Sequence, residues 1–191
     1  MSTEESTHMM SFFRRPITNK RPEREPVSLF QVYQMVRTNR YRPETMALRA
    51  IADEHEQRSY KGANLDYVTP SGLFAYCNDQ SLLHHSGLIC MDLDDLDDVE
   101  DMKCKLLSDP MFETMFMFRS PRGHGLKWWV EIDLTRCDHR TWFTAIRNYL
   151  MATYRLTDKQ VDASCANPSR ACYLPIAGRL LVLTTKTIHA D

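Results

Sequence analysis

The sequence lacks a long hydrophobic run and an excess of charge of one sign. Its 191 residues include 24 Lys or Arg and 25 Asp or Glu, a net charge of −1. No apolar stretch approaches the roughly 20 residues of a membrane-spanning helix, and the polar start MSTEESTHMM is not typical of a secretory signal. We therefore expect a cytoplasmic protein without a membrane segment. The balanced charge excludes a protein that binds nucleic acid through a uniformly basic surface, but it does not exclude a local basic site.

The sequence also lacks a CxxC pair. Its six cysteines are widely spaced, and without a secretory signal we expect them to be reduced thiols, most of them buried. A zinc site built from Cys165, Cys172 and a histidine stays open as an alternative, although the usual short ligand spacing is missing. The sequence contains no internal repeat and no low-complexity tract.

The length allows one ordinary domain with a small extension. Residues 1–26 mix charges with Pro16, Pro22 and Pro26, which predicts a flexible tail or extended arm. Residues 27–86 are predicted to form a small α/β unit, with Ser28 as the N-cap of a short helix. That unit is expected to pack with residues 87–191 as one domain.

Residues 87–191 show a regular alternation of patterns. Short apolar runs predict strands, and apolar residues at helical spacing predict helices. The expected strands cover 88–94, 114–119, 126–132 and 170–174, with a fifth at 179–184. The expected helices cover 97–107 and 138–155. The order is β-α-β-β-α-β, so the fold class is α+β with an RRM-like or ferredoxin-like core. In this arrangement the first and third strands are central neighbours, and the helices cover one face of the sheet.

The alternation of side chains along a strand places charged residues on the face of the sheet that the helices do not cover, which we call the open face. Asp92 and Asp94 lie on the face of the first strand opposite its apolar residues, and Lys127 lies on the same face of the third strand. A pair of carboxylates at i and i+2 suits a hard divalent cation such as Mg²⁺ or Mn²⁺. The acids from Asp97 onward are instead typical of a helix N-terminus.

Two further segments supply candidate phosphate ligands and a third acid. The turn from Ser120 to Lys127 contains Arg122, Gly123 and Gly125, and glycines with basic side chains suit a close approach to phosphates. The segment after the last helix contains Asp162 and Arg170. Asp162 is expected to complete a three-carboxylate site, and Arg170 to bind a phosphate, although a turn Asp and a surface Arg explain them equally well. Lys61, with Ser71 and Gly72, is a weaker candidate for a basic loop over the site.

These segments together resemble a known family. The motifs GLICMDLD ending at Asp94, SPRGHGLK ending at Lys127, and Asp162 followed by SRACY resemble the N-terminal domain of virulence-associated protein E-like proteins of Bacteroidetes and their mobile elements. That domain is similar to the archaeo-eukaryotic primase, or primase-polymerase, superfamily. The match covers roughly residues 27–176.

The resemblance implies template-directed nucleotidyl transfer with two divalent metal ions, Mg²⁺ or Mn²⁺. It implies that Asp92, Asp94 and Asp162 hold the metal, and that Ser120, Arg122, Gly123, Gly125, Lys127 and Arg170 bind nucleotide and phosphate. The implied partners are nucleic acid, with DNA favoured, a nucleoside triphosphate, and a helicase or other replication protein. The superfamily's second motif usually has a histidine entering the third strand, where this sequence has Lys127.

Two alternatives stay open. Lys127 in the histidine position favours a nucleic-acid-binding module that has kept the fold and lost the reaction. A metal-dependent nuclease or replication-initiation protein would need a histidine cluster and a nucleophilic tyrosine near the metal. His84 and His85 are adjacent, and in an extended segment they point to opposite faces, so this alternative ranks lower.

Overall fold

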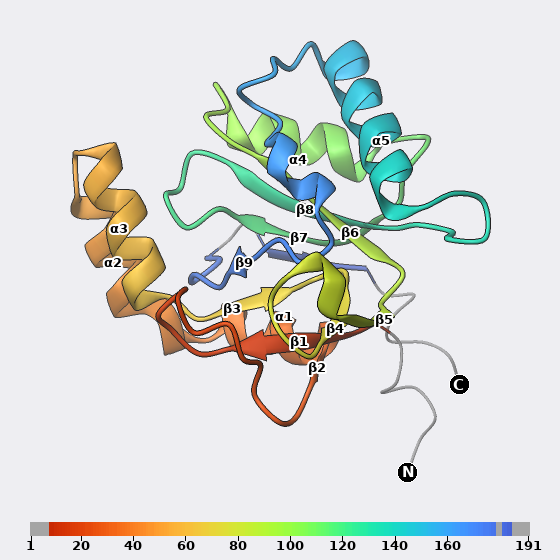
Figure 1. The fold of residues 1–191 in the computed structure, drawn as a ribbon. Helices are drawn as coiled ribbons and strands as arrows, with labels where there is room; N and C mark the ends of the chain where they lie inside the picture. Colours follow the sequence, from red (N-terminus) through yellow and green to blue (C-terminus); the bar gives the residue numbers. More distant parts are fainter. Residues whose placement is uncertain (1–7, 179–180, 185–191) are drawn as a thin grey trace.

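Two four-stranded sheets organise the part of the chain that the computed structural model describes, residues 8–178 and 181–184 (Figure 1). The first sheet contains, in spatial order, β2 (Val27–Ser28), β1 (Met9–Phe13), β3 (Tyr67–Thr69) and β9 (Cys172–Tyr173). The second contains, in spatial order, β10 (Leu181–Leu183), β7 (Thr114–Arg119), β8 (Leu126–Glu131) and β6 (Leu88–Leu93). A separate hairpin pairs β4 (Gly72–Phe74) with β5 (Leu82–His85).

Most of the helices begin at a side chain that caps them. The α-helices are α1 (Leu29–Arg37), α2 (Arg42–Ala50), α3 (Glu54–Asn64), α4 (Val99–Leu107) and α5 (His139–Tyr154), with 3₁₀ turns η1 (Asn39–Tyr41), η2 (Asp79–Ser81) and η3 (Ala163–Ala166). Ser28 caps α1 as predicted, in a reciprocal capping box with Gln31. Asp98 and Asp138 cap α4 and α5 by accepting hydrogen bonds from the first free backbone N–H groups.

The second sheet confirms much of the predicted order. β6, α4, β7, β8 and α5 follow one another as expected, within two residues at each boundary. β8 lies between β6 and β7, and both pairs are antiparallel. The face of β6 with Ile89, Met91 and Leu93 packs in one core with α4 and α5. Figure 1 shows both helices on the same side of this sheet.

The predicted fourth strand is in the wrong place. We expected residues 170–174 to lie beside the first strand, but β9 is only Cys172–Tyr173 and pairs with β3 in the other sheet. On the side of β6 that faces away from β8, the structure has an isolated β-bridge between Leu93 and Val161. β6 is therefore an edge strand rather than a central one. The fifth expected strand is observed as β10, which pairs with β7, while residues 179 and 180 lie outside the described residues.

The N-terminal part of the chain covers the other face of the second sheet. Leu88 and Trp129 of that face share a core cluster with β1, α1 and β3. The cluster ends where β6 and β8 carry Asp92 and Lys127 instead of apolar side chains. The predicted open face is thus mostly a packed interface, and the charged residues are enclosed at one end of it.

The segment predicted as a flexible tail contains an ordered strand. The expected tail covered residues 1–26, of which 1–7 lie outside the described residues. β1 pairs with both β2 and β3, and Met10 and Phe13 are fully buried. The apolar run MMSFF is short and sits among charges and prolines, so its burial depends on long-range pairing that local composition does not reveal.

The buried hydroxyl of Ser11 provides a test of this strand. Ser11 Oγ accepts a hydrogen bond of 2.8 Å from the Phe74 N–H. Replacing Ser11 with alanine leaves that buried donor unpaired, so we expect the free energy of unfolding to fall by about 1–3 kcal/mol. Urea denaturation measures this. Ser59→Ala, on an exposed position of α3, should change it by less than about 0.5 kcal/mol. An equally small effect of Ser11→Ala would contradict the docked position of β1.

No helix among the described residues is long and apolar enough to cross a membrane.

Candidate functional site

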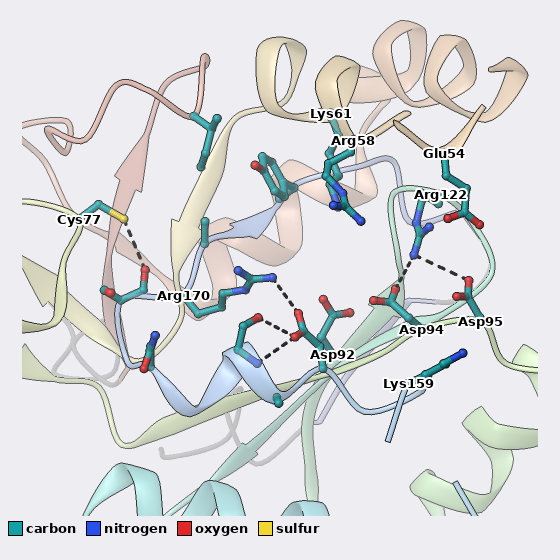
Figure 2. A pocket seen from close by; sticks show the side chains of 18 of the residues that line it. Glu54, Arg58, Lys61, Cys77, Asp92, Asp94, Asp95, Arg122, Lys159 and Arg170 are labelled. Carbon is teal, nitrogen blue, oxygen red and sulfur yellow. Dashed lines mark hydrogen bonds and ion pairs between the residues drawn. The ribbon is translucent and has the colours of Figure 1, made fainter. Parts of the chain in front are cut away.

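A charged cavity of about 800 Å³ lies between α3, the end of β6 and the segment that follows α5. Its cationic lining residues are Lys20, Arg58, Lys61, Arg122, Lys159 and Arg170. Its acidic lining residues are Glu54, Asp92, Asp94, Asp95, Asp158 and Asp162. Figure 2 shows acids of β6 and the residues after it facing basic side chains of α3. The volume falls in the range of typical small-molecule sites.

Asp92 and Lys127 form a buried ion pair at the base of this region. They are register partners on β6 and β8, so the predicted adjacency is confirmed. Lys127 Nζ contacts Asp92 Oδ2, and both side chains are less than 10% exposed. Burial alone lowers the pKa of Lys127, but the Asp92 carboxylate more than compensates, so the pKa is raised and the ammonium stays charged. Burial raises the pKa of Asp92, while the Lys127 ammonium opposes that rise.

The second oxygen of Asp92 has no hydrogen-bond partner. Asp92 Oδ1 is buried and unpaired in the part of the chain that the structure describes. An unpaired buried carboxylate oxygen is costly, and Asp92 lines the cavity. One ligand atom each of Asp92, Asp162 and Cys165 lie within 4.8 Å of one another. Asp92 therefore carries an unpaired buried oxygen and lies beside Asp162 at the wall of the cavity.

Asp162 lies beside Asp92 because the chain after α5 runs along the edge of β6. The N–H of Asp162 donates to the Asp92 carbonyl at 3.1 Å, and the N–H of Asp94 donates to the Gln160 carbonyl at 2.9 Å. Asp162 also accepts hydrogen bonds from Ser164 and a 2.7 Å contact from Arg170 Nη2. Burial opposes ionisation, but these hydrogen bonds and the Arg170 charge hold the pKa of Asp162 below its usual range.

Asp94 lines the same cavity and pairs with Arg122. Arg122 Nη2 lies 3.4 Å from Asp94 and 3.7 Å from Asp95. The structure thus brings the three predicted carboxylates, Asp92, Asp94 and Asp162, together in one cavity. The predicted cations Arg122 and Arg170 are also there, each bound to one of these acids. Lys127 lines a narrow crevice that adjoins the cavity and has Asp92 in common with it.

The remaining members of the predicted phosphate turn lie elsewhere. Ser120, Gly123 and Gly125 are buried, and none of them lines the cavity. The turn is closed by its own hydrogen bonds, from the Ser120 N–H to the Gly125 carbonyl and from the Gly123 N–H to the Ser120 carbonyl. Arg49 donates to the carbonyls of Ser120 and Pro121.

Sequence reasoning missed the basic residues of the cavity that lie outside the motifs. Arg58 is on α3, a helix the sequence analysis did not predict, together with Lys61. Lys20 follows β1, and Lys159 precedes the third acid. The available signals for α3 were the N-cap Asp53, acids in its first turn and Lys61 in its last turn. Of the weaker candidates, Ser71 lines the narrow crevice, while Gly72 pairs with His85 in the β4–β5 hairpin.

The structure does not bring the predicted zinc ligands Cys165, Cys172 and a histidine together among the described residues. All six cysteines are free. Burial raises the pKa of the Cys165 thiol, and the group to which Cys165 belongs contains two carboxylates and no histidine. Cys172 and the histidines do not belong to any metal-type cluster among the residues described. No described histidine lines the cavity, and His85 instead contacts His139 at 3.1 Å.

Comparison with known proteins gives one family. The family model "BT4734-like, N-terminal domain" matches residues 61–176, which include the last turn of α3, β6, the Ser120–Lys127 turn and all three carboxylates. No curated protein and no solved structure matches the chain.

Proposed function

The chain belongs to the family of BT4734-like N-terminal domains, and we propose that this member is a primase-polymerase-like enzyme. The reaction is template-directed nucleotidyl transfer with a divalent metal ion, in the replication of DNA or of a mobile element. Its partners are a nucleoside triphosphate, a primed nucleic acid, and a helicase or other replication protein that opens the duplex. This reaction takes place in the cytoplasm.

The observation that carries this proposal is the unpaired oxygen of Asp92 beside Asp162 in a cation-lined cavity. A divalent ion satisfies such an oxygen, and two of the three donors grouped here, Asp92 and Asp162, are carboxylates. Hard oxygen donors fit Mg²⁺ or Mn²⁺ better than zinc. Asp92, Asp94 and Asp162 would hold the ion. When bound, it neutralises phosphate charge and lowers the pKa of the attacking hydroxyl.

The chain's own residues position the reactants for one substitution at phosphorus. A bond forms between the primer 3′ oxygen and the α-phosphorus, and the bond from that phosphorus to the bridging oxygen of the β-phosphate breaks. Pyrophosphate leaves with the electron pair, and the hydroxyl proton passes to water. The cations around the cavity stabilise the charge on the phosphates. Asp92, Asp94 and Asp162 line the cavity, so the reactants reach the carboxylates from the cavity.

The sheet also supports an RRM-like core, with a modified edge. β6, β7 and β8 have the antiparallel neighbours that this core requires, and α4 and α5 pack on one face. In place of a full fourth strand, residues near Val161 run beside β6 and place Asp162 next to Asp92.

One observation favours the non-catalytic alternative. Each of the three carboxylates already has a cationic partner from the chain, namely Lys127 for Asp92, Arg122 for Asp94 and Arg170 for Asp162. Such compensation lowers the attraction for a metal ion. A binding module would use the same cavity for phosphate groups without performing the transfer.

Primer extension separates the two functions. Purified protein is incubated with a primed DNA or RNA template, labelled nucleotides, and Mg²⁺ or Mn²⁺. We expect incorporation that follows the template sequence and stops when EDTA removes the metal. The contradicting result is binding of the primed template without any incorporation, with either metal ion and with either deoxyribonucleotides or ribonucleotides. It would rule out the proposed activity and favour the binding module.

A further inference from the structure

The predicted phosphate turn uses two of its backbone donors to close itself rather than to bind a ligand. Its N–H groups at Ser120 and Gly123 are used inside the turn, and Ser120 is 3% exposed. Gly125 is needed for packing, because a Cβ there would collide with the Leu93 carbonyl. A phosphate cradle requires backbone N–H groups or cationic side chains that point at the ligand. Of the turn between Ser120 and Gly125, only Arg122 lines the cavity.

Two cations of α3 face the cavity without a carboxylate partner. Arg58 and Lys61 are three residues apart, so they share one face of the helix. Both line the cavity, and neither forms an ion pair with an acid in the part of the chain that is described. Figure 2 shows them projecting from the helix on the side of the cavity opposite Asp92.

Lys61 is held in position by an aromatic ring. Its Nζ lies 5.1 Å from the centre of the Tyr173 ring, which also lines the cavity. Burial, with a smaller contribution from the charge of Lys127, lowers the pKa of Lys61 to about 8. The charges of Asp92 and Asp94 raise the pKa of Lys61 but do not offset these effects, and neither acid forms an ion pair with it. A bound anion therefore stabilises this half-buried ammonium.

We propose that Arg58 and Lys61 of α3 bind the β- and γ-phosphates of a nucleoside triphosphate, while its α-phosphate lies at the carboxylates. This inference rests on the proposed function for the identity of the ligand. The α-phosphate must lie at Asp92 and Asp162 for transfer to occur, so the outer phosphates extend across the cavity. Arg58 and Lys61, which form no ion pair among the described residues, lie on the opposite wall and neutralise these outer phosphates. The cavity is large enough for the whole nucleotide.

The test uses inorganic tripolyphosphate and dATP as probes, in buffer with EDTA, with the full chain. We expect Arg58→Gln/Lys61→Gln to weaken the affinity for both probes at least tenfold. The matched control is Arg24→Gln/Arg42→Gln, which removes the same charge from exposed positions outside the cavity. It should stay within twofold of the wild type. Circular dichroism and thermal unfolding confirm that both variants fold.

Binding of a single-stranded oligonucleotide, measured in parallel, shows whether the site binds the triphosphate of a nucleotide or the phosphates of a nucleic-acid backbone. We expect it to change less than threefold in the α3 variant. Unchanged affinity for tripolyphosphate, or an equal loss for tripolyphosphate and oligonucleotide, would overturn the inference. If the wild type does not extend primers but the α3 variant still loses tripolyphosphate binding, the phosphate site stands and the proposed enzyme fails. If the wild type extends primers and the α3 variant keeps the same KM for dNTP, the inference alone fails.

Discussion

Replacing Lys127 with methionine is expected to lower the free energy of unfolding by about 3–5 kcal/mol at pH 7. The Lys127 ammonium is the partner of Asp92 Oδ2, and Asp92 Oδ1 already has none. Without Lys127, a carboxylate that is 7% exposed stays in the interface between the two sheets with no compensating charge. The pKa of Asp92 rises further in this variant, because burial and the Asp94 charge still raise it while only the smaller effect of Lys61 opposes them. Urea denaturation at pH 7 and pH 5 measures both effects.

The sign of the pH effect follows from that rise. A carboxyl group whose pKa is raised in the folded state is destabilising above its unfolded pKa, and the destabilisation shrinks as the pH falls. The deficit of Lys127→Met should therefore be smaller at pH 5 than at pH 7. The double variant Lys127→Met/Asp92→Leu removes both charges, so it should recover most of the lost stability. A loss below about 1 kcal/mol in the single variant would show that water reaches the pair.

Asp162→Asn is expected to reduce the rate of primer extension by about 100-fold or more, while the protein stays folded. Asn keeps the capping hydrogen bond from Ser164, since amide and carboxylate oxygens both serve as N-caps. It removes the negative charge next to the unpaired Asp92 oxygen, and so weakens the metal site. Loss of even indirect support for a metal ion typically costs 10–100-fold, and loss of a ligand costs more. Single-turnover extension measures this rate.

Asp97→Asn is the matched control for that variant. Asp97 is an exposed acid in the same acidic run but does not line the cavity. Its extension rate should stay within twofold of the wild type. Extension by Asp162→Asn at the wild-type rate would remove Asp162 from the site.

The adjacency of Asp92 and Lys127 could be predicted because it depends on local rules. Side chains alternate along a strand, and the apolar residues of β6 and β8 fix which face meets the helices. The order of strands then makes β6 and β8 neighbours, and the register pairs the two charged residues. Strand periodicity and the order of the elements can both be inferred from a sequence.

Elements that depend on distant contacts could not be predicted in this way. β1 is five residues long and is stabilised by pairing with β3, more than fifty residues away. β9 is two residues long, and it pairs with β3 rather than with β6 because of how the two sheets pack together. α3 is mostly polar, so it has no apolar stripe to reveal it.

The turn between Ser120 and Lys127 shows why a motif alone is ambiguous. Its glycines suit a phosphate loop in composition, but they equally suit a close approach of two segments of backbone. Gly125 packs against the Leu93 carbonyl, and Gly123 adopts a positive φ against Arg49. Which role applies depends on what faces the turn, and that is set by the tertiary structure.

Binding of Mn²⁺, followed by the electron paramagnetic resonance signal of the free ion, tests the central claim most directly. The claim is that Asp92, Asp94 and Asp162 hold a divalent metal. We expect saturable binding by the wild type, and affinity at least tenfold weaker for Asp94→Asn/Asp162→Asn. The control Asp97→Asn/Asp101→Asn, which removes two acids outside the cavity, should bind as the wild type does. Equal affinity for wild type and Asp94→Asn/Asp162→Asn, or no saturable binding by the wild type, would contradict the account.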